Sequence, residues 1–186
     1  MKSWIKTKKY DKEKKELLQQ LFDKYLPETF LHLKKNMKYL VPVVEISMVI
    51  SICRLIESLM DKHEVKGVEF VFVFSCVWCI GGGFAEKDGR DYRKEFSNWW
   101  KEKWKVIKFP NKGTVFDYYV DLDQSKLEEW NKMQTKDVEK DIDTSKSISL
   151  YTIPTSDTIS TSYLMKQFIS VDHSPMLVGN AGCGKT

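Results

Sequence analysis

The last eight residues of the sequence form the motif whose residue types and spacing predict chemistry. They match the pattern GxxxxGK[ST] and read Gly179, Asn180, Ala181, Gly182, Cys183, Gly184, Lys185 and Thr186. Glycines let the backbone curl so that successive N–H groups point at phosphate oxygens. The lysine reaches the β- and γ-phosphates, and the threonine hydroxyl ligates Mg²⁺. These eight residues are therefore predicted to bind ATP with Mg²⁺, and Thr186 is the predicted metal ligand.

The segments that lead to the motif resemble the beginning of an α/β domain. Ser149 to Ile153 is predicted to be a short strand, and Ser156 or Asp157 is expected to cap the helix that follows. Pro175 to Val178 is predicted to be a short buried strand that runs directly into the glycine-rich loop. A further helix is expected to begin at the loop and to add its positive end to the anion site.

No catalytic residue is assigned, because the sequence holds no strand after the motif. P-loop ATPases carry the acid that positions Mg²⁺ on such a later strand, and they need further strands to bury the first. Because the motif ends at Thr186, the chain is expected to be a segment of a longer polypeptide. The segment alone is expected to bind ATP weakly or not at all, and any hydrolysis would belong to the longer chain.

Upstream of these segments, hydrophobic periodicity predicts helices. They are predicted at 12–26, 28–40, 45–60 and 91–107. Pro27 is expected to separate the first two, and Ile46 and Ile50 are expected on the inward stripe of the third. The apolar segment 68–80 stays open between strand and helix, because its Val, Phe and Trp content favours a strand whereas its length favours a helix. The glycines 81–83 end it in either case.

The pattern changes after these helices. Pro110 to Gly113 is a predicted turn, and Thr114 to Asp121 is a predicted strand. A second short strand near Leu127 to Trp130 is expected to pair with it through the turn at Asp123 to Lys126. The polar residues 132–147 are predicted to be a surface linker. The predicted fold is thus mostly α with a small β-hairpin, followed by the first α/β elements of a P-loop NTPase domain.

The charge and the cysteines exclude several classes of function. The 186 residues carry a net charge of +4, and three of the 30 basic residues are arginines. Since base and phosphate readers rely on arginine, no nucleic-acid partner is expected, and the basic run Lys2 to Lys15 is interpreted as a solvated helix face or a frayed end. The longest apolar run, Phe70 to Ile80, is too short to cross a membrane, which needs about 20 residues. Cys76 and Cys79 are expected to be reduced, because no second pair completes a zinc site.

Five stretches of the sequence, taken together and in order, resemble the dynein heavy chains, most closely the axonemal, outer-arm β-type chains. They are VPVVEISMVISICRLIESLM (41–60), FVFVFSCVWCIGGGF (70–84), DYRKEFSNWWKEKW (91–104), FPNKGTVFDYYVD (109–121) and MLVGNAGCGKT (176–186). The resemblance implies that the segment 68–80 is a helix.

The resemblance also implies a domain organisation. Residues 1–108 correspond to the helical lid subdomain of the second AAA+ module, 109–131 to a β-hairpin connector and 132–147 to a polar linker. Residues 148–186 then correspond to the start of the third AAA+ module, which ends in the P-loop. Gly179, Gly184, Lys185 and Thr186 match the phosphate-binding pattern of that family. Arg54 could contact a phosphate of the second module, although a salt bridge is the favoured interpretation.

The family implies a function for the whole polypeptide. Dynein heavy chains are ATP-dependent, minus-end-directed microtubule motors of cilia and flagella, and this P-loop would be a regulatory ATP site. The implied partners are the neighbouring AAA+ modules of the same heavy chain and, through the full-length protein, microtubules and dynein intermediate and light chains. The implied location is the cytoplasm and cytoskeleton, in the axoneme of the cilium or flagellum.

An alternative belongs to a different class. The chain could be a short stand-alone protein that keeps the dynein lid as a non-catalytic helical interaction module. The size of the native polypeptide distinguishes the two hypotheses, because only a longer chain continues past Thr186.

Overall fold

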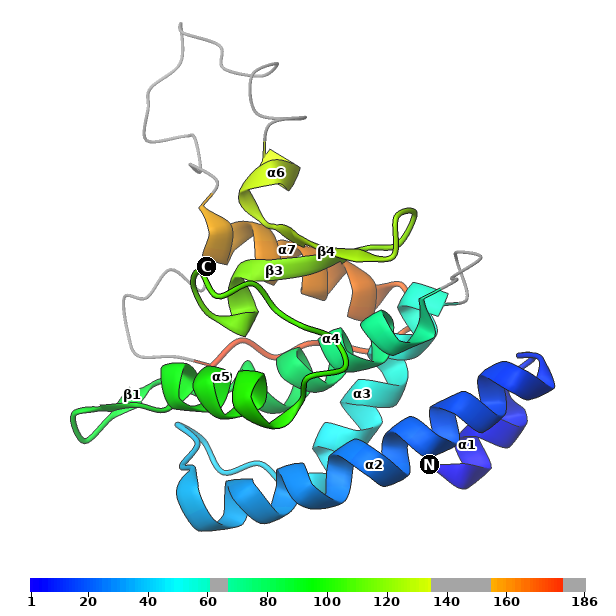
Figure 1. Cartoon of the computed structure of the whole chain (residues 1–186), viewed down its shortest axis with the longest axis horizontal. Helices are drawn as coiled ribbons and strands as arrows, with labels where there is room; N and C mark the ends of the chain where they lie inside the picture. The colour runs from blue at the N-terminus through cyan, green and yellow to red at the C-terminus, as the bar shows by residue number, and fades with distance from the viewer. Residues whose placement is uncertain (61–66, 135–154, 179–186) are drawn as a thin grey trace, which may run out of the picture.

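The computed structural model describes residues 1–60, 67–134 and 155–178 (Figure 1). The described chain is a helical assembly with two small antiparallel hairpins on its surface. The helices are α1 (Lys2–Thr7), α2 (Lys12–Asn36), α3 (Glu45–Met60), α4 (Val68–Gly81), α5 (Tyr92–Lys103), α6 (Asn131–Gln134) and α7 (Ser156–Ile169). The strands are β1 (Glu86–Lys87), β2 (Arg90–Asp91), β3 (Tyr118–Asp121) and β4 (Lys126–Glu129), and a 3₁₀ turn, η1, spans Val115–Asp117. The mostly helical fold with a β-hairpin that the sequence predicts is confirmed.

Helix α2 runs without a break through Pro27, so the prediction of two helices separated at this proline is wrong. Proline removes the hydrogen bond to the carbonyl four residues earlier, which here belongs to Asp23. Both Pro27 and Asp23 lie on the exposed face, where water can bond that carbonyl. The opposite face stays buried on both sides of the proline, through Tyr25, Leu26, Thr29 and Leu33. Packing of this face therefore maintains the helix.

Helix α4 fills the centre of the molecule, between α3 on one side and the β3–β4 hairpin on the other (Figure 1). Ten of its fourteen residues are buried and the other four are half-buried, which explains why its sequence shows no amphipathic periodicity. The helix ends at Gly81, where a side chain would have no room. A Cβ atom on Gly81 would lie 2.6 Å from the Phe116 ring and 2.7 Å from the Phe96 ring. The glycine thus lets α5 and η1 pack directly against the end of α4.

Helix α3 buries most of its apolar residues, but two of those expected on its inward stripe are exposed. Met48, Ile52 and Leu55 are buried, whereas Ile46 and Ile50 are 62% and 46% exposed. The placement of Ile46 and Ile50 on the inward stripe is therefore wrong. The two isoleucines are four residues apart and share one helix row, which points away from α4. A helix that is apolar on several faces gives no unique inward stripe from its sequence alone.

Helix α5 supplies the largest side chains of the core. Trp100 is fully buried, and Trp104, the C-cap residue of the helix, is 7% exposed. Trp99 stacks on the His32 ring of α2 with 4.0 Å between the ring centroids. The tryptophans of this helix are therefore packing residues. The helix ends at Lys103 rather than at Ile107, and the Asp91 side chain accepts a hydrogen bond from the Lys94 amide at its start.

The β3–β4 hairpin forms close to the predicted place. Tyr118 pairs with Glu129 and Asp121 pairs with Lys126. The strand begins at Tyr118 rather than at Thr114, because the preceding residues form η1. In this turn the Asp117 carboxylate accepts hydrogen bonds from the Thr114 amide at 2.6 Å and from the Thr114 hydroxyl at 3.0 Å. Such side-chain bonds compete with a strand ladder.

Within the described ranges no helix is both long enough and apolar enough to cross a membrane. Three cysteines fall in these ranges, Cys53, Cys76 and Cys79, and all three are free thiols. Burial raises the pKa of the Cys53 thiol to about 11. At neutral pH such a thiol is protonated and unreactive, as expected for a packing residue.

Candidate functional site

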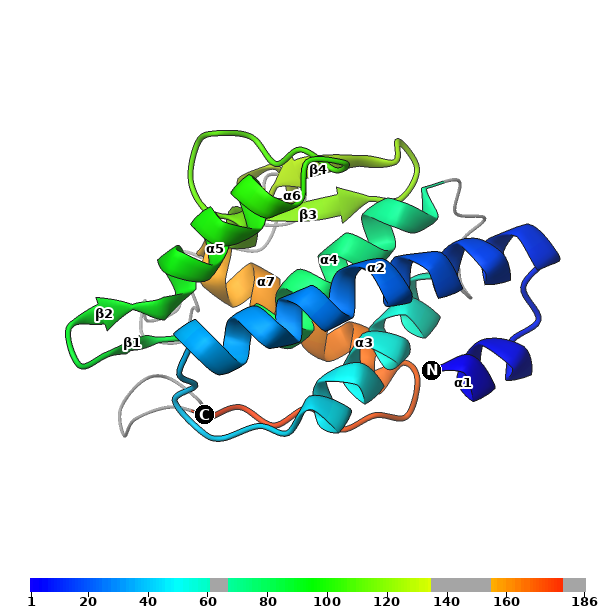
Figure 2. The same cartoon turned by 60° about the horizontal axis from the view of Figure 1, so that its bottom comes forward.

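The eight motif residues, Gly179 to Thr186, lie outside the residues that the structure describes, and so does the predicted strand Ser149 to Ile153. The described chain reaches Val178, the residue just before the motif. The structure therefore shows which elements lead to the candidate site and what holds them. These elements are α7 and the extended segment 171–178, which Figure 2 shows passing beside the helices.

The segment Pro175 to Val178 is neither a strand nor buried, so that prediction is wrong for the described structure. Met176, Leu177 and Val178 are 81%, 44% and 51% exposed. An apolar strand is buried only when neighbouring strands bond it and helices cover it. Both pairs of strands in the described ranges lie elsewhere, in the β1–β2 and β3–β4 hairpins. The apolar sequence of 176–178 thus has no sheet to join here.

Helix α7 begins one residue earlier than predicted, with Thr155 rather than Ser156 or Asp157 as its N-cap. The Thr155 hydroxyl accepts a hydrogen bond from the Thr158 amide at 3.2 Å, and the Thr155 amide donates to the Thr158 hydroxyl at 2.8 Å. This reciprocal pair is a capping box, which satisfies two backbone donors at the helix start. The cap fixes the residue at which the helix begins.

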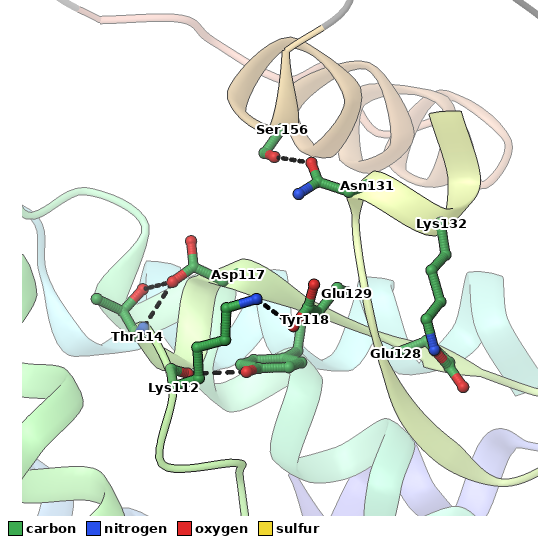
Figure 3. Close-up of polar contacts among 9 residues, drawn as sticks. All are labelled: Lys112, Thr114, Asp117, Tyr118, Glu128, Glu129, Asn131, Lys132 and Ser156. Atoms are coloured by element: carbon green, nitrogen blue, oxygen red, sulfur yellow. Dashed lines mark hydrogen bonds and ion pairs between the residues drawn. The ribbon is translucent and has the colours of Figure 1, made fainter. Parts of the chain in front are cut away.

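A side-chain hydrogen bond joins the start of α7 to the end of the β3–β4 hairpin (Figure 3). The Ser156 hydroxyl donates to Asn131 Oδ1 at 2.6 Å. Asn131 opens the short helix α6, which occupies 131–134 and so replaces the beginning of the predicted linker with helix. Lys132, one residue on, pairs with Glu128 at 2.5 Å and holds α6 against β4. Ser156 and Asn131 are 25 residues apart in sequence, so this bond is a tertiary contact.

An aromatic cluster near this junction packs against Tyr163 of α7, a helix that also packs against α3. Trp130 is 1% exposed, and its indole N–H donates to the Phe116 carbonyl at 2.9 Å. The Tyr163 ring of α7 lies 5.4 Å from the Trp130 ring and 6.3 Å from the Phe74 ring of α4, both edge to face. Trp78 completes the cluster, with its ring 6.0 Å from that of Trp130. The cluster therefore binds α7 to α4 through the hairpin.

Arg93 of α5 lies at the edge of this cluster. Its guanidinium lies 4.4 Å from the Phe116 ring centre and 5.6 Å from that of Trp78. Burial lowers the pKa of Arg93, while Asp157, Asp117 and Asp91 act in the opposite direction. A guanidinium stays charged under such a shift. Its charge thus links α5 electrostatically to the first turn of α7, which carries Asp157.

The loop before the hairpin is held by Lys101 of α5. Its ammonium donates to the carbonyl of Pro110 at 2.7 Å and to that of Gly113 at 2.8 Å. Gly113 adopts a φ of +65°, and a Cβ atom there would lie 2.4 Å from the Asp117 carboxylate. The predicted turn at 110–113 is confirmed, and glycine is needed at its last position.

Arg54 makes the salt bridge that the sequence favoured. Its guanidinium lies 3.1 Å from Glu57, and the Lys8 ammonium contacts the same carboxylate. Burial raises the pKa of Glu57, but the two cations more than offset this effect, so the pKa lies below its usual value. Arg54 therefore has a structural partner. Within residues 1–60, 67–134 and 155–178, no group of three His, Cys, Asp or Glu side chains could hold a metal ion.

Comparison with known proteins identifies the two parts that meet at this junction. Residues 18–132 match the dynein heavy chain AAA lid domain, and residues 140–186 match the P-loop containing dynein motor region. The bond between Asn131 and Ser156 thus joins a lid to the beginning of a P-loop region. A P-loop region implies nucleotide binding.

Full-length relatives agree with these matches. The chain is 38% identical over 191 residues to human dynein axonemal heavy chain 17 and 36% identical over 190 residues to human dynein axonemal heavy chain 9. It is 37% identical over 191 residues to the ciliary dynein beta chain of Heliocidaris crassispina. Each alignment covers 99% of this chain and 4% of the relative. The chain therefore belongs to the dynein heavy chain family, and it spans about 4% of the length of these relatives.

Proposed function

We propose that this chain is part of the motor ring of an axonemal dynein heavy chain, where it joins the second AAA+ module to the third. The order of the two matches, a lid over 18–132 followed by a P-loop region over 140–186, carries this proposal. In it, residues 1–108 form the lid of the second module and 109–131 the connector. Residues 132–147 link them to the third module, which starts at 148.

The same proposal assigns roles to the motif residues. The backbone from Gly179 to Gly184 cradles the phosphates of ATP, Lys185 neutralises the β- and γ-phosphates, and the Thr186 hydroxyl ligates Mg²⁺. The acid that positions the metal would come from a later part of the heavy chain. The site would then regulate a motor whose principal hydrolysis takes place in another module.

The contacts of α7 support a mechanical role for the junction. Trp130 and Tyr163 are packed edge to face, and Ser156 is hydrogen bonded to Asn131. The helix that leads to the P-loop is thus attached to the lid that precedes it. A movement of the lid would shift α7 and, with it, the extended segment 171–178 that leads to the nucleotide site.

The remaining roles follow from the relatives, whose names describe axonemal, ciliary and flagellar chains. In the full-length protein we infer ATP-driven sliding along microtubules, at the axoneme of a cilium or flagellum. Neighbouring AAA+ modules of the same chain would contact this segment directly. Intermediate and light chains would bind other parts of the heavy chain.

The proposal is tested by Lys185→Ala in the full-length heavy chain that contains this segment. The purified chain is labelled with a photoreactive ATP analogue and digested, and label is measured in peptides from residues 148–186. Label in these peptides is expected to fall at least about tenfold, since the lysine contacts two phosphates. Lys166→Ala, on α7 and outside the motif, serves as the matched control and is expected to keep the label. Equal labelling of both variants would contradict the assignment of the P-loop.

A second measurement separates the motor from a stand-alone lid module. An antibody against residues 114–135 is used on axonemes extracted with high salt and Mg-ATP. A single very large band is expected, and a band near 22 kDa with no larger species would favour the interaction module.

A further inference from the structure

The charge of this chain is concentrated at one end. Of its 30 basic and 26 acidic residues, seven and three lie in residues 1–16, which leaves 23 of each sign in the rest. The first sixteen residues therefore carry a formal charge of +4, equal to that of the whole chain. This imbalance is independent of the P-loop and of the junction at α7.

The structure folds this basic segment into two helices with a groove between them. Helix α1 turns back at Lys8 to Asp11 and lies beside the first turns of α2 (Figure 2). The groove between the two helices has a volume of about 430 Å³ and is open to solvent. Its walls include Lys2, Ile5 and Lys6 from α1 and Lys15, Glu16 and Gln20 from α2.

The groove combines free positive charge with an apolar floor. Lys2 and Lys6 are four residues apart and so lie on one face of α1, and Lys15 faces them from α2. In the described part of the chain these three lysines have no ion-pair partner. The one carboxylate of the groove, on Glu16, lies 3.8 Å from Lys12, which compensates its charge. Ile5, 4% exposed, forms part of the floor.

The composition of the groove is a poor match for a nucleic-acid partner. All cations of the first sixteen residues are lysines, whereas recognition of nucleic-acid phosphates and bases relies on the planar fork of arginine. An anionic membrane is also a poor match. The apolar side chains of α1 pack inward, with Ile5 buried, Trp4 half-buried and the Trp4 ring 6.4 Å from the Phe22 ring, so α1 offers little apolar surface to a bilayer.

We propose that the groove between α1 and α2 binds an acidic peptide segment that carries an apolar side chain. Its carboxylates would pair with Lys2 and Lys6 on one wall and with Lys15 on the other, and its apolar side chain would cover the floor at Ile5. The Gln20 amide offers both a donor and an acceptor to the backbone of the bound segment. Complementary charge would guide the association and set its orientation.

The experiment uses the whole 186-residue chain and a fluorescein-labelled peptide in which glutamate alternates with valine. Binding is measured by fluorescence anisotropy. The triple variant Lys2→Glu/Lys6→Glu/Lys15→Glu is expected to weaken binding at least about tenfold, since three attractive contacts become repulsive. Binding to the unmodified chain is also expected to weaken as salt rises, because the lysines are exposed.

The matched control is Lys35→Glu/Lys38→Glu/Lys94→Glu, which changes the net charge by the same amount at exposed positions away from the groove. It is expected to alter the Kd by less than about twofold. If the groove variant loses its far-UV circular dichroism, Lys6→Gln replaces it, with an expected weakening of about threefold. Equal loss in groove and control variants would overturn the proposal. So would tighter binding of duplex DNA or phosphatidylserine vesicles than of the peptide.

Discussion

The two hairpins of this molecule have the same antiparallel pairing but different sources of stability. All four residues of β1 and β2 are exposed, and the hairpin projects from the start of α5 (Figure 1). In β3, by contrast, Tyr118 and Val120 are buried, and Trp130 follows β4 into the core. The first hairpin depends on its turn, and the second on the side chains beneath it.

This difference shows where the lid is connected to α7. The β1–β2 hairpin contacts α5, partly through the ion pair of Arg90 with Glu95. The β3–β4 hairpin lies over α4 and places Trp130 against Tyr163 of α7. Changes in the second hairpin should therefore affect the whole junction, whereas changes in the first should remain local.

The largest expected effect is that of Trp130→Ala. Removing a fully buried tryptophan leaves a cavity and is expected to cost about 3–5 kcal/mol of unfolding free energy. The variant also leaves the Phe116 carbonyl without its indole donor. Urea denaturation followed by circular dichroism measures the loss. A loss below about 1 kcal/mol would show that the cluster does not hold the hairpin.

A smaller effect is expected at high pH for Tyr163. Burial raises the pKa of Tyr163 to about 12, first through desolvation and then through Tyr119. The unfolded state ionises near pH 10, so the folded state loses stability relative to it as the pH rises from about 10 to 12. Tyr163→Phe cannot ionise and should be more resistant to alkali, by roughly 2–3 kcal/mol at pH 12. Unfolding curves at pH 8 and above pH 11 measure the difference; parallel losses for both proteins would contradict it.

Ser156→Ala tests the hydrogen bond that fastens α7. The loss is expected to be about 1 kcal/mol, because one neutral hydrogen bond at an exposed site disappears. Asn131→Ala should cost a similar amount. The stability loss of the double variant should exceed the larger of the two single losses by at most about 0.5 kcal/mol. Fully additive losses would mean that the two side chains act independently.

Gly89→Ala tests the first hairpin and should be the smallest of these effects on the whole molecule. Asp88 and Gly89 have φ values of 54° and 76°, which an alanine adopts at a cost of about 1 kcal/mol. Since nothing lies within 4 Å of a Cβ atom there, the cost is one of backbone conformation alone. We expect faster hydrogen exchange in 86–91 and an unchanged near-ultraviolet signal from the tryptophans. A changed aromatic signal would mean that the hairpin is coupled to the core.

The sequence predicts helices and turns well where local chemistry decides them. The bounds of α3 agree with the prediction, and the turn before β4 lies at residues 122–125, one residue before the predicted 123–126. The β1–β2 hairpin was not predicted, although Asp88-Gly89 is a strong local signal for a two-residue turn. Features that depend on tertiary packing are harder to predict from the sequence. The continuity of α2 through Pro27, for example, depends on packing of the opposite face.

The elements around the candidate site divide in the same way, into features set by local sequence and features set by tertiary packing. The capping box of Thr155 and Thr158 is local and could have been found from sequence, whereas the Ser156–Asn131 bond and the position of Arg93 depend on the folded arrangement. The exposure of Met176 to Val178 also depends on that arrangement, because a strand needs neighbours that its own sequence does not specify.

The length of helix α2 has a mechanical consequence. At 1.5 Å per residue, its 25 residues form a rod about 37 Å long, which spans the assembly from the α1 groove to the end near the β1–β2 hairpin (Figure 2). Because packing keeps the helix continuous through Pro27, a load applied at its first turn is transmitted along its axis to Asn36. The stiffness of the lid is therefore greatest along one direction, and a segment seated in the groove would pull on the lid along that same axis.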